Sequence, residues 1–579
     1  MDLHAMRHSA AHVMAQAIRE LYPNAQFAFG PETETGFYYD VKIPGGAIGN
    51  EDLPKIEKGM QRIAKGRHPF VRSEMSRDEA LKYFGSQEFK VKALEGLLAG
   101  EKTVSLYEQN GFTDLCKGPH VEHTGQIGAF SVDRIAGSYW LGDSKNEPLQ
   151  RVYGLCFPTM DELKEYKTMM EEARKRDHRE VGKKLDLFSF HEEGPGFVFW
   201  HPKGLTLFNT LISFIRDEND SRGSREIKTP EILSVDLWHR SGHYDNFREH
   251  MYFTSAEEKP YAVKPMNCPG SILVYKEGLH SFRDLPLRLM EMGHVHRFEL
   301  SGVLHGLFRL RAFTQDDGHI YCAPEQVEGE ISSFVDYVFH VYKIFGFEDV
   351  TVFVSTRPEH SMGADEVWES STNALKSALE KKGVAYKVKE GEGAFYGPKI
   401  EFNVKDCIKR NWQLGTIQVD FSMPERFELD YVHTDGSRRR PVLLHRAVLG
   451  SLERFLGIYM EQVVGAFPPW LAPVQAAILS VTDNQNEYAK EILAALKAGG
   501  VRAELDVSGE RLNKKIRNAQ LAKTPYMIIL GEKEAAARNI SVRLRSGENV
   551  NEISTETFVR TVGDLSASRS NVLWPVLPS

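Results

Sequence analysis

The most informative pattern of polar and apolar positions lies at residues 309–319. If this stretch is a β-strand, every second side chain points to the same face. That face would then carry two cations, an aromatic ring, an amide, a carboxylate and an imidazole, from Arg309, Arg311, Phe313, Gln315, Asp317 and His319. A buried structural strand would show aliphatic side chains there, so the pattern favours a functional face. A polar outer face without chemistry is the alternative.

The residues before this stretch predict a long hairpin. Residues 304–306 are expected to form its loop and residues 294–299 its returning strand. Arg297 and Glu299 share parity on that strand, so both are expected to join the same face. A bulge near Gly318 is the feature that would disturb this arrangement.

The remaining periodicity predicts an α+β multidomain protein. Helical spacing opens the chain at Met6, Ala10, Val13, Ala17 and Leu21. Residues 159–184 are charged, with mixed signs and few helix breakers, which predicts an exposed linker helix. In residues 185–469 strands and helices do not follow βαβ order, so an antiparallel α+β domain is expected. No phosphate-binding loop or dinucleotide fingerprint occurs, so side chains must hold any nucleotide.

Apolar runs alternate with helical segments beyond residue 470, which predicts a small α/β domain with partly parallel strands. The expected domains are therefore 1–158, the linker 159–184, 185–469 and 470–579. A basic helix is expected at residues 511–522, and a solvated face and a phosphate-contacting face are equally consistent with it. Its cations, with one just beyond, are Arg511, Lys514, Lys515, Arg517 and Lys523.

Composition excludes a disordered or a collagen-like chain. At 579 residues with 41% hydrophobic positions, the chain is globular and too long for one core. A net charge of −8 argues against binding nucleic acid through overall charge, but leaves room for a local basic surface. Five scattered cysteines, including Cys407, are typical of a reducing compartment. No signal peptide or apolar stretch of membrane-spanning length is present, so a soluble, cytoplasmic protein is expected.

Three groups of residues are candidates for chemistry. Cys268, His319 and His445 are suitable zinc ligands, but their spacing matches no zinc finger, and each is more often an ordinary core residue. In the N-terminal part, two pairs have the same separation, His8 with His12 and Cys116 with His120, near Asp114. They fit a hydrolytic pocket, a second metal site, or ordinary surface and turn positions. Arg454 lies in an apolar helix and needs an anionic or aromatic partner, which Glu453 or a nucleotide could supply.

Seven segments in this order resemble the threonyl-tRNA synthetase family of class II aminoacyl-tRNA synthetases, over essentially the whole chain. They are RHSAAH at 7–12, GFYYD at 36–40, CKGPH at 116–120, KPMNCPG at 264–270, FTQDD at 313–317, GEGAFYGPKIE at 391–401 and HRAVLGSLER at 445–454. The combination is highly specific, although no single segment is. The resemblance implies an antiparallel class II catalytic core, an N-terminal α+β editing domain and a C-terminal α/β anticodon-binding domain.

For ATP, the resemblance implies that Arg297 binds the α-phosphate and the amino-acid carboxylate, and that Glu299 lies near the adenine amino group. Arg309 is expected at the γ-phosphate, with Phe313 and Arg454 on the two faces of adenine. Gln413 and Gln418 lie in matching segments, and Mg²⁺ is expected to accompany the triphosphate.

For threonine, the resemblance implies one Zn²⁺ per subunit on Cys268, His319 and His445, with the amino acid on the open side of the metal. Gln315, Asp317 and Tyr396 correspond to residues around the threonine amine and hydroxyl. Such a site rejects valine, which lacks the hydroxyl, but separates serine from threonine by only about 1–3 kcal/mol. A second, hydrolytic site is therefore expected.

The N-terminal domain resembles that second site, which clears serine from mischarged threonine tRNA with positioned water and no metal. Its residues are expected to be His8, His12, Lys90, Asp114, Cys116 and His120. The C-terminal domain resembles an anticodon-binding domain, which gives its basic helix an RNA role. The family forms homodimers through a segment ending near Pro230. Because the sequence begins almost on the first motif, we expect it to lack the small N-terminal module common in bacterial members, through either a real absence or a shortened gene model.

Two alternatives remain open: a synthetase-like RNA-binding or regulatory protein, and a related class II enzyme for serine or proline. Retention of Arg297, Arg309, Arg454 and the three metal ligands argues against the first, because a protein that only binds RNA has no need of them.

Overall fold

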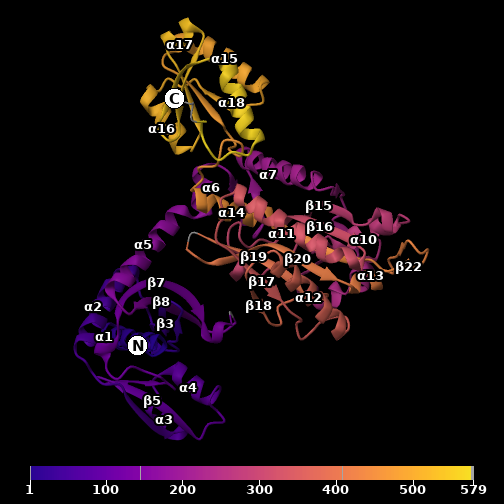
Figure 1. The fold of residues 1–579 in the computed structure, drawn as a ribbon. Helices are drawn as coiled ribbons and strands as arrows, with labels where there is room; N and C mark the ends of the chain where they lie inside the picture. The colour runs from indigo at the N-terminus through magenta and orange to yellow at the C-terminus, as the bar shows by residue number, and fades with distance from the viewer. Residues whose placement is uncertain (1, 144, 407, 576–579) are drawn as a thin grey trace. The chain divides into compact units, whose positions relative to one another are not determined.

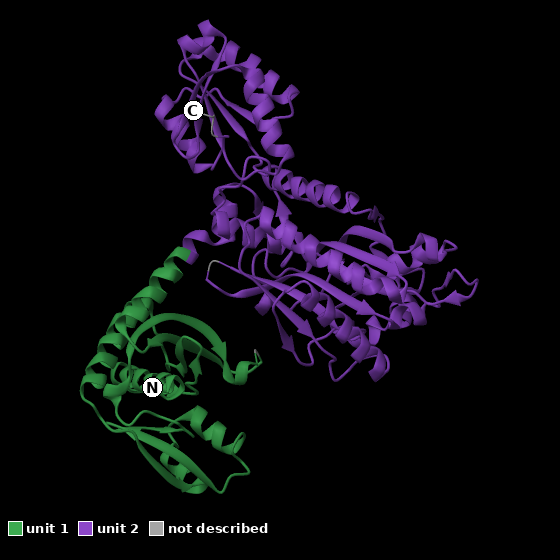
Figure 2. Cartoon of the chain, in the orientation of Figure 1, with its two compact units in different colours: residues 1–172 green, residues 173–579 purple. Residues whose placement is uncertain are grey.

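A computed structural model of the protein describes residues 2–143, 145–406 and 408–575, so Cys407 lies outside the described residues. The chain divides into two compact units, residues 1–172 and 173–579 (Figure 2). Each unit has its own hydrophobic core. Among the described helices, none is long and apolar enough to cross a membrane.

The first unit packs a buried helix against an antiparallel sheet. Helix α1 (Leu3–Leu21) buries Met6, Ala10, Val13 and Ala17 as its periodicity predicts, whereas Leu21 at its end is exposed. The sheet has the order β1-β3-β8-β7, with β2 paired to β3, and α2 (Leu53–Lys65) lies against α1. Its strands are β1 (Gln26–Phe27), β2 (Glu32–Thr33), β3 (Gly36–Lys42), β7 (Ala129–Tyr139) and β8 (Pro148–Phe157).

A second, three-stranded sheet completes this unit. It has the order β4-β5-β6 and is antiparallel. Its strands and adjoining helices are β4 (Val71–Ser76), β5 (Thr103–Gln109), β6 (Phe112–Leu115), α3 (Arg77–Tyr83) and α4 (Glu88–Glu95).

The predicted linker helix is two helices. Helix α5 (Met160–Arg176) ends before Asp177, whose side chain accepts a hydrogen bond from the Arg179 N–H and so caps α6 (His178–Lys184). The expectation of one exposed helix is therefore wrong for its last turns, because α6 buries His178 and Val181.

An eight-stranded sheet forms the centre of the second unit (Figure 1). It is antiparallel except at its two ends, where β11 pairs with β15 and β17 with β18 in parallel, which confirms the predicted α+β architecture. In sheet order its strands are β11 (Arg225–Glu226), β15 (Leu287–His296), β16 (Ala312–Cys322), β23 (Val442–Ala447), β20 (Asn411–Asp420), β19 (Lys399–Lys405), β17 (Val350–Ser355) and β18 (Tyr386–Lys389).

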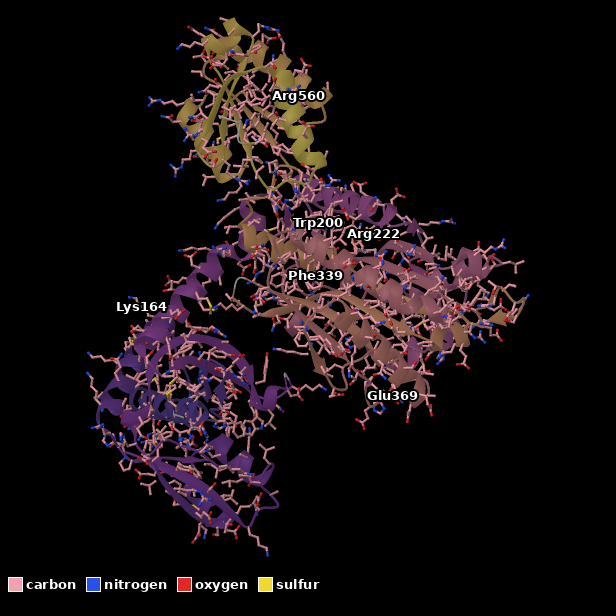
Figure 3. The ribbon with its side chains drawn as sticks, viewed as in Figure 1. Lys164, Trp200, Arg222, Phe339, Glu369 and Arg560 are labelled. Carbon is pink, nitrogen blue, oxygen red and sulfur yellow. The ribbon has the colours of Figure 1, made fainter. Side chains whose placement is uncertain are left out.

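Helices cover this sheet with their apolar faces and expose their charged ones. Figure 3 labels Glu369 on α12 (Asp365–Lys381), which is exposed, whereas Trp368 beside it is buried. The other main helices are α7 (Pro202–Asp220), α10 (Cys268–Lys276), α11 (Val327–Ile344) and α14 (Leu452–Val463). A small antiparallel sheet, β12 (Ile232–Ser234), β14 (Lys259–Val263) and β13 (Tyr252–Ala256), lies in the same unit.

The hairpin differs from its prediction at the loop. Strand β15 ends at His296 and β16 begins at Ala312, so the connection spans residues 297–311 and is longer than the expected 304–306. Arg297, Glu299, Arg309 and Arg311 therefore lie in the connection. No bulge near Gly318 disturbs the predicted regular strand: the described pairing runs without a shift from Leu287 opposite Tyr321 to His296 opposite Ala312.

The C-terminal part has the predicted mixed sheet, with order β25-β24-β26-β27-β28. The first three strands are parallel and the last two antiparallel. Its elements are β24 (Ala476–Ser480), α15 (Asn486–Ala498), β25 (Ala503–Asp506), α16 (Leu512–Leu521), β26 (Tyr526–Leu530), α17 (Glu532–Ala537), β27 (Ile540–Leu544), β28 (Asn549–Ile553) and α18 (Thr555–Ala567).

Candidate functional site

A cavity of about 390 Å³ opens over the central strands of the second unit. Strands β16, β20 and β23, the hairpin connection and the start of α14 all line it. The predicted residues that line it are Arg297, Glu299, Arg309, Phe313, Gln315, Asp317, Tyr396, Gln413, Gln418, His445, Arg454 and Cys268. His319 is buried and lies next to His445, with ring centroids 5.0 Å apart.

The side chains on the two faces of β16 have different surroundings. Phe313, Gln315 and Asp317 face the cavity. On the opposite face, the buried Asp316 carboxylate accepts hydrogen bonds from the N–H groups of Val448, Leu449 and Gly450 at 2.7–3.0 Å. These bonds fix the turn that precedes α14 and its Arg454.

A second carboxylate ties the same two segments together. Glu453, also buried, accepts a hydrogen bond from the backbone N–H of Thr314 at 2.9 Å and another from the Ser451 hydroxyl. Sequence analysis missed Asp316 and proposed Glu453 only as a possible partner of Arg454. Neither role had a local signal, because Val448 and Thr314 each lie more than 130 positions from the carboxylate that they contact.

Three guanidinium groups give the cavity a positive end. Arg297, Arg309 and Arg454 all line it. The pKa of Arg454 falls to about 10, first because of burial and then because of repulsion from Arg309 and Arg297. Cations that repel one another in a buried cavity are stabilised by an anionic ligand such as a polyphosphate.

Arg311 does not join this group. Its guanidinium donates to the carbonyl oxygens of Glu299, at 2.9 Å, and Pro195, at 3.2 Å. The predicted position of its side chain on the functional face is therefore wrong. The reason is that regular alternation begins only at Ala312, where the strand starts.

Another part of the cavity lining holds a polar group around Asp317. Burial raises the pKa of the Asp317 carboxyl, and the hydrogen bond from Asn267 at 3.0 Å opposes this shift. The Tyr396 hydroxyl donates to the side-chain oxygen of Gln418. These groups could orient a small ligand that carries both an amine and a hydroxyl.

The donor atoms of Cys268, His319 and His445 lie within 4.8 Å of one another, and all three residues are buried. Nε2 of His319 is buried without a hydrogen-bond partner in the described structure, as expected of an atom meant for a metal. One thiol and two imidazoles suit zinc and leave a fourth position open. The donor set therefore fits the metal that the resemblance implies.

Two further residues support this group. Asp420 Oδ2 lies 3.0 Å from Nε2 of His445. Nδ1 of His445 is therefore the ring nitrogen that remains available to bind a metal. His243 Nε2 lies 3.6 Å from Cys268 Sγ. Sequence analysis missed both. Asp420 had a signal, because it shares strand parity with Gln418, whereas His243 had none.

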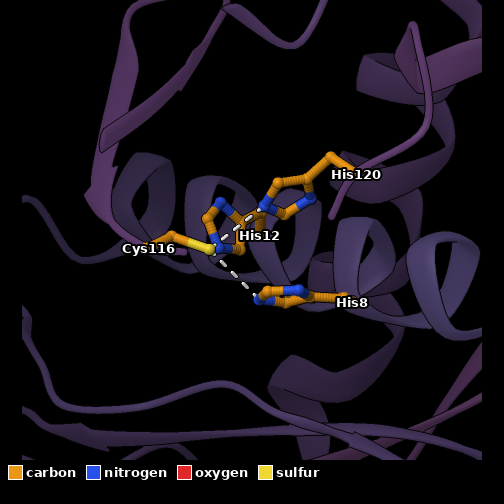
Figure 4. A group of neighbouring side chains, drawn as sticks. All are labelled: His8, His12, Cys116 and His120. Carbon is orange, nitrogen blue, oxygen red and sulfur yellow. Dashed lines mark hydrogen bonds between the residues drawn. The ribbon is translucent and has the colours of Figure 1, made fainter. Parts of the chain in front are cut away.

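The first unit brings the other predicted group together (Figure 4). Helix α1 places His8 and His12 one turn apart, and Cys116 Sγ lies 3.4 Å from Nε2 of His8 and 3.3 Å from Nε2 of His120. A cavity of about 480 Å³ adjoins them, lined by His8, His12, Lys90, Asp114 and Cys116.

Burial keeps this group uncharged. It raises the pKa of the Cys116 thiol to about 12 and lowers the pKa of His12 to about 3. A thiol with so high a pKa is a poor nucleophile. The arrangement therefore suits neutral side chains that position a water molecule better than covalent catalysis by Cys116.

A buried ion pair borders the cavity. Lys90 Nζ lies 2.5 Å from Asp114 Oδ1, and both the Lys90 ammonium and Asp114 contact the Tyr39 hydroxyl. Asp114 is buried, which works to raise its pKa, but the charge of Lys90 and the hydrogen bonds from Lys90 and Tyr39 outweigh burial, and the pKa is lowered. Tyr39 was missed, although it lies within the GFYYD segment.

The basic helix α16 departs from its prediction at one residue. Arg511, Lys514 and Arg517 are exposed, and Lys523 is half-buried. Lys515 is 3% exposed, and its ammonium donates to the carbonyl oxygens of Ser480 and Asp506. Its predicted contact with RNA is therefore revised, because its charge is satisfied inside the domain.

Three family models match the chain. Residues 252–463 match the tRNA synthetase class II core domain (G, H, P, S and T). Residues 475–565 match the anticodon binding domain, and residues 104–153 match the threonyl and alanyl tRNA synthetase second additional domain. Together with the antiparallel sheet and its cationic cavity, these matches define a class II aminoacyl-tRNA synthetase.

Comparison with individual proteins identifies the family within the class II synthetases. The threonine–tRNA ligase of Clostridium botulinum (strain Kyoto / Type A2) is 51% identical over 568 residues, covering 98% of this chain and 89% of that protein. The threonine–tRNA ligase of Acetivibrio thermocellus is 51% identical over 569 residues, with the same coverage. The chain belongs to the threonine–tRNA ligase family.

Solved structures agree with this assignment. The RNA binding domain of threonyl-tRNA synthetase from Cryptosporidium parvum Iowa II is similar with a TM-score of 0.65 and 42% identity, covering 68% of this chain and 99% of that one. A putative threonyl-tRNA synthetase, ThrRS-1, from Aeropyrum pernix is similar with a TM-score of 0.59 and 28% identity, covering 70% and 98%.

Proposed function

We propose that the cavity of the second unit is where threonine is activated. As a member of this family, the enzyme ligates L-threonine to its tRNA: ATP, L-threonine and tRNA give threonyl-tRNA, AMP and diphosphate through a threonyl-adenylate. The main evidence is that one cavity is lined both by three cations, Arg297, Arg309 and Arg454, and by Cys268 and His445 of the metal-binding donor set.

The cationic end is proposed to bind ATP with its Mg²⁺. Arg297 contacts the α-phosphate and the threonine carboxylate, and Arg309 contacts the γ-phosphate. Adenine lies between Phe313 and Arg454, with Glu299 at its amino group. Gln413 also lines the cavity, and its backbone carbonyl oxygen accepts a hydrogen bond from the Arg454 guanidinium at 3.4 Å. The lowered pKa of Arg454 supports this assignment, because the anion relieves repulsion among the guanidinium groups.

The other end is proposed to bind threonine. Cys268, His319 and His445 would hold one zinc ion, which supplies a Lewis-acid position for the amine and hydroxyl of the substrate. Asp317 accepts the hydroxyl proton in a hydrogen bond, and Gln315 and Tyr396 orient the amine. Valine has no hydroxyl to donate to Asp317 and is rejected for that reason.

The chemistry needs no protein nucleophile. The threonine carboxylate attacks the α-phosphorus in line and pyrophosphate leaves, while Arg297 stabilises the charge that spreads over the phosphoryl oxygens. The 3′-hydroxyl of the terminal adenosine of tRNA then attacks the carbonyl carbon, and AMP leaves. Rate acceleration comes from orientation and charge stabilisation within a buried cavity.

Threonine-dependent exchange of pyrophosphate into ATP tests this assignment. Exchange is expected with threonine, more weakly with serine, and at background with valine or proline. Serine retains the hydroxyl and loses one methyl, worth about 1–3 kcal/mol, so its kcat/KM should fall roughly 10–200-fold. Equal or better exchange with proline or serine would assign the enzyme to another amino acid, and no exchange with any amino acid would favour a binding-only protein.

The cavity of the first unit is proposed to edit seryl-tRNA. The match of residues 104–153 to the threonyl and alanyl tRNA synthetase second additional domain supports this proposal. His8, His12, Cys116 and His120 position the attacking water, and Lys90 with Asp114 holds the ester end of the substrate. The neutral state of His12 and Cys116 supports hydrolysis by positioned water.

The double substitution His8→Ala with Cys116→Ala is expected to slow hydrolysis of seryl-tRNA at least about a hundredfold, because two groups that position the water are lost. Threonylation of tRNA should change by less than twofold, since the residues lie in the other unit. His123→Ala is the matched control, because His123 belongs to the same unit but not to the cavity lining. Unchanged hydrolysis of seryl-tRNA in the double variant would refute the proposal.

The remaining assignments concern domains and partners. We propose domains at 1–158 for editing, 159–184 for the linker, 185–469 for catalysis and 470–579 for the anticodon. Threonine tRNA is proposed to contact Arg511, Lys514, Arg517 and Lys523, because these cations reach the surface of the C-terminal domain. A homodimer is supported by exposed apolar side chains, Ile232 and Phe253, on the small sheet beside the predicted interface. A cytoplasmic location follows from the role of the family in translation.

A further inference from the structure

His178 is buried at the start of α6, in a segment that its sequence presents as a charged linker. Its side chain is 0% exposed although the flanking residues Asp177 and Arg179 reach solvent. None of the roles assigned above uses it. A fully buried histidine outside any assigned site needs a reason in its hydrogen bonds.

Those hydrogen bonds join three separate segments. Nδ1 of His178 lies 2.8 Å from Oε1 of Glu461 on α14, and the backbone N–H of His178 donates to the same oxygen at 3.2 Å. Nε2 accepts a hydrogen bond at 2.9 Å from the backbone N–H of Leu307 in the hairpin connection. Since Nε2 accepts a hydrogen bond, the ring proton lies on Nδ1, and Nδ1–H donates a hydrogen bond to Glu461 Oε1.

The turn that His178 holds belongs to the proposed ATP site. The backbone N–H of His305 donates to the carbonyl oxygen of Arg309, and the N–H of Arg309 donates to the carbonyl oxygen of His305. Residues 305–309 therefore form a closed turn. Leu307, Phe308 and Arg309 line the cavity, and the Phe308 carbonyl accepts a hydrogen bond from Arg454 Nε at 3.0 Å. The turn thus lies between His178 on one side and Arg454 on the other.

Gly306 shows how closely the turn approaches the histidine. Its φ of +48° lies in the left-handed region, and a Cβ atom there would lie 2.2 Å from His178 Nε2. The Phe308 ring packs against the imidazole with centroids 4.3 Å apart. The position of the turn is therefore set both by a hydrogen bond and by contact with the ring.

We propose that His178 is a positioning residue for ATP: it holds the turn 305–309 so that Arg309 already faces the triphosphate before ATP arrives. This inference rests on the proposed ATP site. Without the imidazole, ATP would have to order the turn on binding, and that cost would appear as weaker binding. Gln315, Asp317 and His319 are held by the ladder of β16 instead, so threonine binding does not depend on His178.

His178→Ala tests this in threonine-dependent ATP–pyrophosphate exchange. The KM for ATP is expected to rise about tenfold, which is the effect of losing the one buried hydrogen bond between the imidazole and the turn, from Leu307 N–H to Nε2. The KM for threonine should stay within twofold. His178→Gln keeps an acceptor that can reach the Leu307 N–H, so its KM for ATP should lie between wild type and His178→Ala. A merely structural role would lower the melting temperature and the active fraction, but neither changes the KM of the folded enzyme.

Two further variants separate the possible outcomes. His201→Ala is the matched control, because His201 also contacts a carboxylate, Asp186, but does not contact the turn. Arg309→Ala tests the ATP site itself. If Arg309→Ala raises the KM for ATP and both His178 variants leave it within twofold, the positioning role is refuted alone. If Arg309→Ala also leaves it unchanged, the proposed ATP site falls with it.

Discussion

Replacing Arg297 with alanine is expected to reduce threonine-dependent ATP–pyrophosphate exchange about a thousandfold, the effect of removing one preorganised charge-stabilising donor. Arg297 is held in place before any ligand binds: Nε donates to the Pro265 carbonyl at 3.2 Å, and the guanidinium lies over the rings of Phe247 and Phe313. Burial lowers the pKa of this guanidinium, so the side chain is poised for an anion. Most of the loss should appear in kcat, because the charge it meets is greatest in the transition state.

Two variants make this prediction specific. Arg297→Lys keeps a positive charge but not the planar fork, so its exchange rate should fall between wild type and Arg297→Ala. Arg288→Ala serves as the matched control, because Arg288 lies on the adjacent strand β15 and pairs with Glu330 outside the cavity. A loss of less than tenfold in Arg297→Ala would contradict its assigned contact with the α-phosphate.

Removal of one proposed metal ligand is the second large effect expected. Cys268→Ala leaves only two protein donors, His319 and His445, which is too few for a stable zinc site. Purified protein should then contain less than about one-tenth of a zinc ion per chain, and threonine-dependent exchange should fall at least about a thousandfold. Zinc content measured by mass spectrometry is independent of activity.

Cys322→Ala is the matched control for this substitution. Cys322 is buried on the same unit, at the end of β16, but does not belong to the donor group. It should keep one zinc per chain and near wild-type exchange. Stoichiometric zinc in Cys268→Ala would show that the metal, if present, is held elsewhere.

Period-two alternation on β16 could be predicted because strand geometry alone decides it. Phe313, Gln315 and Asp317 do share one face, and the ladder is regular through Gly318. What the pattern could not show is where the strand starts. Arg311 has the right parity but precedes the strand, and its guanidinium binds backbone carbonyls instead.

Contacts between distant segments explain the other differences. Asp316 and His178 acquire their roles from partners far away in the sequence, which no local period encodes. Lys515 was misjudged for a related reason: its position on an amphipathic helix suggested an exposed charge, yet its long side chain reaches two carbonyl oxygens inside the domain.

X-ray absorption at the zinc K-edge tests whether Cys268, His319 and His445 hold a zinc ion whose open side binds threonine. For zinc-loaded protein we expect one sulfur at about 2.3 Å and two imidazole nitrogens at about 2.0–2.1 Å from the metal. Addition of threonine should add oxygen and nitrogen neighbours, whereas valine at the same concentration should add fewer or none. A zinc site with four protein ligands that threonine leaves unchanged, or a zinc site without sulfur, would contradict this assignment of the metal ligands.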